Sequence, residues 1–108
     1  MRLYHNPRCS KSRQAFSLLE SKGIEFEDYR YLDNGILSDD FEVLLALDGI
    51  IRTNDLEPGT LFNPQNKKEL QILLTINPKL LQRPVLIHDG KAIIGRPPEE
   101  ILTLLHDI

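Results

Sequence analysis

Polar and apolar positions change their period along the first third of the chain. Residues 1–5 are too few for a helix, and residues 24–32 alternate polar and apolar side chains, so both segments are predicted to be strands. Across residues 10–22, apolar positions recur at the three-to-four-residue spacing of a helix face, and Gly23 follows where glycine often ends a helix. Residues 33–35, Asp-Asn-Gly, indicate a turn after the second strand.

The middle of the chain is predicted to be helical. Ser38 is the expected N-cap of a helix that ends near Gly49. Residues 50–59 contain proline and glycine and are predicted to form a short helical turn and a loop. A second helix is expected to start at Asn66, which with Glu69 resembles a capping box.

The last third of the chain predicts a hairpin followed by a helix. Residues 85–87 and 92–94 are short β-rich segments, and Asp89-Gly90 between them is a strong signal for a tight hairpin turn. Pro97-Pro98 is expected to open the last helix. The order β-α-β-(α,α)-β-β-α predicts an α/β fold, with a mixed four-stranded sheet and helices on both faces.

Composition narrows the classes of protein that the chain can represent. It has 108 residues, of which 41% are hydrophobic and 27% charged, values that argue against a disordered or coiled-coil protein. The net charge of −3 argues against binding to nucleic acid. We expect no contact with membranes, because no apolar segment is long enough to span one. The single cysteine excludes an internal disulfide and favours the reducing cytoplasm.

Cys9 is the first candidate for chemistry. It lies in the loop before the first predicted helix, among Arg8, Lys11 and Arg13, with His5 upstream. Cationic neighbours and the N-terminus of a helix both favour a thiolate, and reactive cysteines in such places have pKa values of roughly 3.5–7.5 against about 8.5 for a free thiol. We therefore expect the pKa of Cys9 to lie below about 7.5. The alternative is a small, buried and inert cysteine.

Three arginines are the second candidate. Arg83 and Arg96 lie at the ends of predicted strands, and Arg52 lies in an irregular segment, so the fold could gather them around an oxyanion. Three separate, solvated arginines are the alternative interpretation. No metal site is predicted, because the histidines share no spacing typical of metal ligands: His5, His88 and His106.

Several motifs occur together, in a fixed order. They are Tyr4-His5-Asn6-Pro7-Arg8-Cys9-Ser10-Lys11-Ser12-Arg13, Arg52, Arg83-Pro84-Val85 and Gly95-Arg96-Pro97-Pro98-Glu99. This pattern resembles the glutaredoxin-linked arsenate reductase family over nearly the whole chain. The resemblance implies a thioredoxin-like fold for a single domain, residues 1–108, with a helical insertion at about residues 36–81.

The resemblance also implies roles for individual residues. Cys9 would be the nucleophile, and Arg52, Arg83 and Arg96 would be catalytic and would hold the arsenate and arsenite groups. Ser12 and His5 would also lie at the substrate, where the Ser12 hydroxyl could hydrogen-bond to the Cys9 thiolate. The Arg83–Pro84 peptide bond would be cis, as the corresponding proline typically is in thioredoxin-like folds.

The activity that follows from the resemblance is reduction of arsenate to arsenite by a monomer with no bound cofactor. Glutathione would be the co-substrate and glutaredoxin the partner that recycles Cys9. Ser10-Lys11 replaces the Gly-Thr that follows the cysteine in well-characterised reductases, and the chain ends at Ile108 without their C-terminal extension, which is typical of a short subgroup with Cys-Ser-Lys-Ser in the loop. Two alternatives remain: a glutathione-dependent thiol reductase acting on another substrate, and a non-catalytic regulatory binding module of the Spx type.

Overall fold

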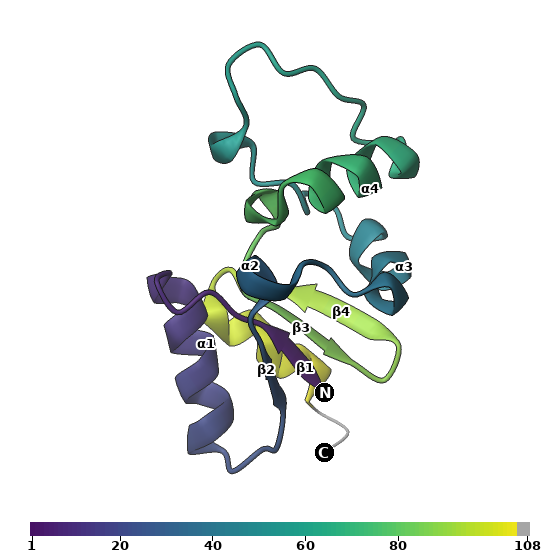
Figure 1. Ribbon diagram of the computed structural model, residues 1–108. Coiled ribbons are helices and arrows are strands. Elements are labelled where there is room, and N and C mark those ends of the chain that lie inside the picture. The colour runs from purple at the N-terminus through teal and green to yellow at the C-terminus, as the bar shows by residue number, and fades with distance from the viewer. Residues whose placement is uncertain (106–108) are drawn as a thin grey trace.

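A mixed four-stranded sheet forms the centre of the computed structural model, which describes residues 1–105 (Figure 1). The strand order is β2-β1-β3-β4. Strand β1 (Arg2–Tyr4) pairs in parallel with β2 (Glu27–Tyr29) and antiparallel with β3 (Val85–His88), which pairs antiparallel with β4 (Lys91–Ile94). The predicted mixed sheet is confirmed.

One face of the sheet is covered by α1 (Ser10–Ser21) and by the 3-10 helix η4 (Pro98–Leu104) (Figure 1). Because side chains alternate between the faces of a strand, Leu3 and Leu86 point to this side of the sheet. A compact apolar cluster joins the sheet to both helices: Leu3, Ala15, Leu19, Leu86, Ile101 and Leu105.

The chain between β2 and β3 covers the other face. It forms three α-helices, α2 (Tyr31–Asn34), α3 (Phe41–Leu45) and α4 (Lys67–Ile76). Three short 3-10 helices lie between or after them: η1 (Ser38–Asp40), η2 (Thr53–Asp55) and η3 (Pro78–Leu80).

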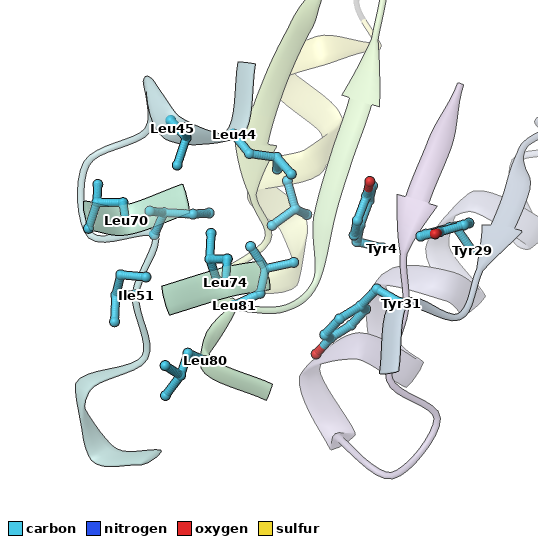
Figure 2. Packing of buried hydrophobic residues seen from close by; sticks show 12 residues of the cluster. Tyr4, Tyr29, Tyr31, Leu44, Leu45, Ile51, Leu70, Leu74, Leu80 and Leu81 are labelled. Carbon is cyan, nitrogen blue, oxygen red and sulfur yellow. The ribbon is translucent and has the colours of Figure 1, made fainter. Parts of the chain in front are cut away.

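A larger apolar cluster lies on this second side of the sheet. Tyr4 and Val85 of the sheet join it, next to Tyr29 and Tyr31, with leucine and isoleucine side chains from the helical segment (Figure 2). Helices therefore cover both faces, as expected. The single domain with an insertion at about residues 36–81 stays a prediction.

The region after β2 differs from the predicted one. The strand spans three residues rather than 24–32, because Tyr31 already begins α2. Residues 33–35 are the end of that helix rather than a separate turn, and Gly35 closes it with a φ of +77°. Ser38 is not a side-chain N-cap, since it lies inside η1 and Leu37 precedes that helix.

Two turn signals in the sequence are confirmed. Asn66 caps α4, because its Oδ1 accepts hydrogen bonds from the backbone N–H groups of Lys68 and Glu69 at 3.1 and 3.2 Å. In the hairpin, Asp89 and Gly90 both have positive φ angles, +53° and +73°, as a type I′ turn requires.

The helix after Pro97 forms as expected, but it is a 3-10 helix rather than an α-helix. Within the described part of the chain, residues 1–105, no helix is long and apolar enough to cross a membrane.

Candidate functional site

Cys9 occupies the N-cap position of α1. Its backbone is extended, and its N–H donates to the carbonyl of Asn6 at 3.0 Å, which closes the turn after β1. The Asn6 side chain also accepts from the N–H of Arg8 at 3.0 Å. These bonds hold Cys9 at the start of the helix, where unpaired N–H groups point outward. Cys9 is partly exposed, as a nucleophilic residue needs to be.

The pKa of Cys9 is lower than that of an ordinary thiol. Burial alone would raise the pKa, because it disfavours the charged thiolate. Hydrogen bonds from the backbone N–H groups of Ser12 and Lys11, together with the charge and hydrogen bond of the Arg83 guanidinium, outweigh that effect. The direction agrees with the sequence prediction, but the dominant cation is a distant arginine. Arg8 and Arg13 are exposed.

Ser12 and His5 form a buried pair beneath the loop. Ser12 is fully buried and His5 is 4% exposed. The Ser12 hydroxyl lies 2.6 Å from His5 Nδ1 and accepts a hydrogen bond from the N–H of Asn6 at 2.9 Å. A hydrogen bond from the backbone N–H of Ser12 also lowers the pKa of the Cys9 thiol. The one expected from the Ser12 hydroxyl stays a prediction. Both side chains are buried, and their mutual contact holds the loop from below. Their contact with substrate stays a prediction.

Arg83 and Arg96 come together at the sulfur. Arg96 Nη2 lies 3.7 Å from Cys9 Sγ, and Arg96 Nε donates to the carbonyl of Arg83 at 2.9 Å. The peptide bond between Arg83 and Pro84 is cis, as expected, and a second cis bond that was not expected joins Arg96 to Pro97.

Arg52 joins the same group through a shared carboxylate. Asp55 Oδ2 lies 3.1 Å from Arg52 Nε and 3.3 Å from Arg83 Nη1. The backbone N–H of Arg52 donates to the carbonyl of Leu80, which fixes the start of η2 against η3. The three predicted arginines are thus linked through Asp55 and Cys9 rather than dispersed in solvent.

Two further residues belong to this group and were not among the predicted ones. Asp55 holds two of the arginines, and Tyr31 is fully buried among the same charges. In the sequence, Asp55 is one of 16 acidic residues and Tyr31 is one of three tyrosines in or near strands. Neither has a distinctive spacing, so only the tertiary structure could identify them.

The site combines a stabilised thiolate with permanent positive charge. Guanidinium groups suit an anion with several oxygens, and a thiolate can attack the atom at the centre of such an anion. Within residues 1–105, no group of three or more His, Cys, Asp or Glu side chains could hold a metal ion. His106, one of the histidines considered for a metal site, lies outside the described residues.

Comparison with known proteins identifies a family. A model described as the ArsC family matches residues 4–104 of the chain. An arsenate reductase of Neisseria meningitidis is 41% identical, with 97% of both chains covered. A second relative, the Escherichia coli protein named "Uncharacterized protein YfgD", is 34% identical over 97% of this chain and 96% of its own length.

Solved structures support the same relationship. The structure described as an arsenate reductase from Vibrio cholerae superposes with a TM-score of 0.78 at 29% sequence identity, covering 95% of this chain and 97% of that one. The fold is therefore thioredoxin-like, as predicted. The assignment to a subgroup marked by Cys-Ser-Lys-Ser stays a prediction.

Proposed function

The chain belongs to the ArsC family, and we propose that it is an arsenate reductase-like oxidoreductase in which the Cys9 thiolate attacks the arsenic atom of arsenate. One observation carries this proposal: Arg83 and Arg96 meet at the sulfur of Cys9, which has a lowered pKa. Arginines at that place neutralise the bound oxyanion and the charge that develops on it during attack.

The proposed reaction has three steps. First, the Cys9 sulfur bonds to arsenic, and one arsenate oxygen takes up protons and leaves as water. Second, a glutathione thiolate attacks the Cys9 sulfur, and the electron pair of the broken sulfur–arsenic bond stays on arsenic. Arsenic is thereby reduced from the +5 to the +3 state and leaves as arsenite, while Cys9 and glutathione form a mixed disulfide. Third, a glutaredoxin thiolate attacks the glutathione sulfur and frees Cys9.

The need for an outside thiol follows from the composition of the chain. Cys9 is the single cysteine, and position 12 holds a serine, whose hydroxyl does not attack sulfur at neutral pH. Cys9 therefore cannot exchange disulfides with a second cysteine of the same chain, as the two cysteines of thioredoxin do. Glutathione with glutaredoxin is the proposed source of electrons. The proposed site in the cell is the cytoplasm, where a reducing thiol pool maintains such a cysteine.

Arsenite formation by the purified protein tests the proposal. With arsenate, glutathione and glutaredoxin we expect several turnovers, and Cys9→Ser should abolish them because the nucleophile is lost. With glutaredoxin omitted, mass spectrometry should show one glutathione on Cys9. The matched control is Ser10→Ala, which alters the same loop without removing the thiol.

Three results would redirect the assignment. Glutathione-dependent reduction of mixed disulfides without arsenite formation would favour the other thiol reductase activity. Partner capture that survives Cys9→Ser, in a protein without turnover, would favour the regulatory binding module. Several turnovers with thioredoxin as the sole reductant would contradict the link to glutaredoxin.

A further inference from the structure

Tyr31 has a buried hydroxyl with no hydrogen-bond partner among residues 1–105. The side chain is fully buried at the start of α2. Its two aromatic neighbours use their hydroxyls elsewhere, since Tyr4 donates to Asp40 and Tyr29 donates to the carbonyl of Gly35. Figure 2 shows the Tyr31 hydroxyl directed away from both. A buried polar group left without a partner costs free energy, so this one requires an explanation.

The surroundings of this hydroxyl belong to the candidate site. The charged and titratable groups that act on it are Arg83, Cys9, Arg52 and Asp55. Burial raises the pKa of Tyr31 to about 12, despite the opposing effect of the two arginines, so the hydroxyl stays protonated at neutral pH. It is therefore a neutral hydrogen-bond donor that lies within electrostatic reach of Cys9, Arg83 and Arg52.

Two guanidinium nitrogens at the same site also lack an aligned hydrogen-bond acceptor. Arg83 Nε is buried without a partner, and Arg52 Nε lies within ion-pair distance of Asp55 but makes no hydrogen bond within the described residues. Across residues 1–105, four buried side-chain polar atoms have no partner, and three of them are donors of this one site. Three unused donors that interact with one another near a thiolate fit a ligand with several acceptor oxygens.

We infer that Tyr31 is a substrate-binding residue, whose hydroxyl donates a hydrogen bond to an oxygen of a tetrahedral oxyanion held between Cys9 and the arginines. This inference rests on the proposed function, because it assigns the oxyanion to the same site. Tyr31 makes and breaks no covalent bond. As a neutral donor it adds affinity for the oxyanion without adding positive charge beside the thiolate.

The test is protection of Cys9 from iodoacetamide by arsenate and, separately, by inorganic phosphate of the same shape. Tyr31→Phe keeps the buried ring and removes only the unpartnered hydroxyl, so the variant should melt at or above the temperature of the original protein. We expect about tenfold more arsenate or phosphate to be needed for half-protection, as for one lost hydrogen bond to a charged ligand. The pH midpoint of alkylation without oxyanion should not move.

Tyr29→Phe is the matched control. It makes the same change in the same aromatic cluster, but on a hydroxyl that donates to Gly35, so it should lower the melting temperature and leave protection unchanged. Equal protection in Tyr31→Phe and the original protein would overturn the inference. A shifted alkylation midpoint in Tyr31→Phe would also overturn it, since the hydroxyl would then serve the sulfur.

The two oxyanions separate this inference from the proposed function. Phosphate protection that weakens in Tyr31→Phe, in a protein that forms no arsenite, would support the binding role and contradict arsenate reduction. Arsenite formation, with equal protection in Tyr31→Phe and the original protein, would support arsenate reduction and contradict the binding role of Tyr31. Absence of protection by either oxyanion in the original protein would contradict both.

Discussion

The charge on the Cys9 sulfur depends on groups that reach it from two directions. The N–H groups of Lys11 and Ser12 are supplied locally by the first turn of α1, whereas Arg83 comes from the loop before β3. The local part was predictable, because a cysteine before a helix faces its unpaired N–H groups. For the distant part, the sequence left two interpretations open, gathered or separately solvated arginines, since 74 sequence positions separate residue 9 from residue 83.

Replacing Arg83 tests this division. Arg83→Ala should move the pH midpoint of Cys9 alkylation upward, because it removes a cation that lowers the pKa, so less thiolate remains at neutral pH. Arsenate reduction should lose about 2–4 kcal/mol of transition-state stabilisation, as for the loss of one oxyanion donor. Arg83→Lys should restore part of it, because lysine keeps the charge without the planar fork.

Arg8→Ala is the control for the first measurement. Arg8 is next to Cys9 in sequence but is exposed, so the alkylation midpoint should stay in place. A midpoint that moves in Arg8→Ala and not in Arg83→Ala would show that the neighbouring loop cations, rather than the distant arginine, stabilise the thiolate.

At the scale of elements, the arginine positions depend on two chain segments in close contact. Gly95 follows β4, and its N–H donates to the carbonyl of Pro84 at 2.8 Å. A Cβ atom at Gly95 would lie 2.8 Å from Pro84 Cγ and 3.0 Å from Ile101 Cγ2, which is too close for a ring and a buried side chain to accommodate without moving. The glycine therefore lets Arg96 reach the sulfur from β4.

Gly95→Ala should consequently destabilise the protein. We expect a loss of about 1–3 kcal/mol in the free energy of unfolding, measured by urea denaturation, because the added methyl overpacks the contact. Weaker protection of Cys9 by arsenate should accompany it, since Arg96 follows directly. Lys91→Ala, at the exposed start of β4, is the control and should change neither quantity. If Gly95→Ala were as stable as the original protein, the segments around Gly95 and Pro84 would have to move apart at no cost in the free energy of unfolding.

The elements that sequence patterns predicted well share a local cause. Helix α1 has a regular apolar face, α4 has an Asn66 cap, and the hairpin has two residues suited to positive φ angles. The boundary between β2 and α2 was wrong because alternation continues through Tyr31, although the pairing with β1 ends at Tyr29. Pairing length depends on the partner strand, which the sequence of one segment does not reveal.

At the scale of the whole molecule, the site exists because the helical segment between β2 and β3 is anchored to the sheet. That segment carries Arg52 and Asp55, whereas Cys9 lies in the loop after β1 and Arg96 lies just after β4. Individual candidates could be chosen from sequence as charged or nucleophilic residues next to predicted strand ends. How these candidates come together, and that Asp55 and Tyr31 join them, depends on the packing of this segment on the sheet and could not be predicted from sequence.

Asp40 is a main anchor of that segment, and its replacement should destabilise the whole fold. It is 5% exposed in η1, and its carboxylate accepts two hydrogen bonds from Arg2 of β1, both at 2.8 Å, and one from the Tyr4 hydroxyl. Asp40→Ala leaves both donors without their acceptor, so we expect a loss of about 2–4 kcal/mol in the free energy of unfolding.

Glu27→Ala is the matched control. It removes the other carboxylate that binds Arg2, at 3.2 Å and half exposed, and should cost below about 1 kcal/mol. Urea denaturation of the two variants measures the difference, and equal losses would mean that the buried position of Asp40 adds nothing to the anchoring of the helical segment.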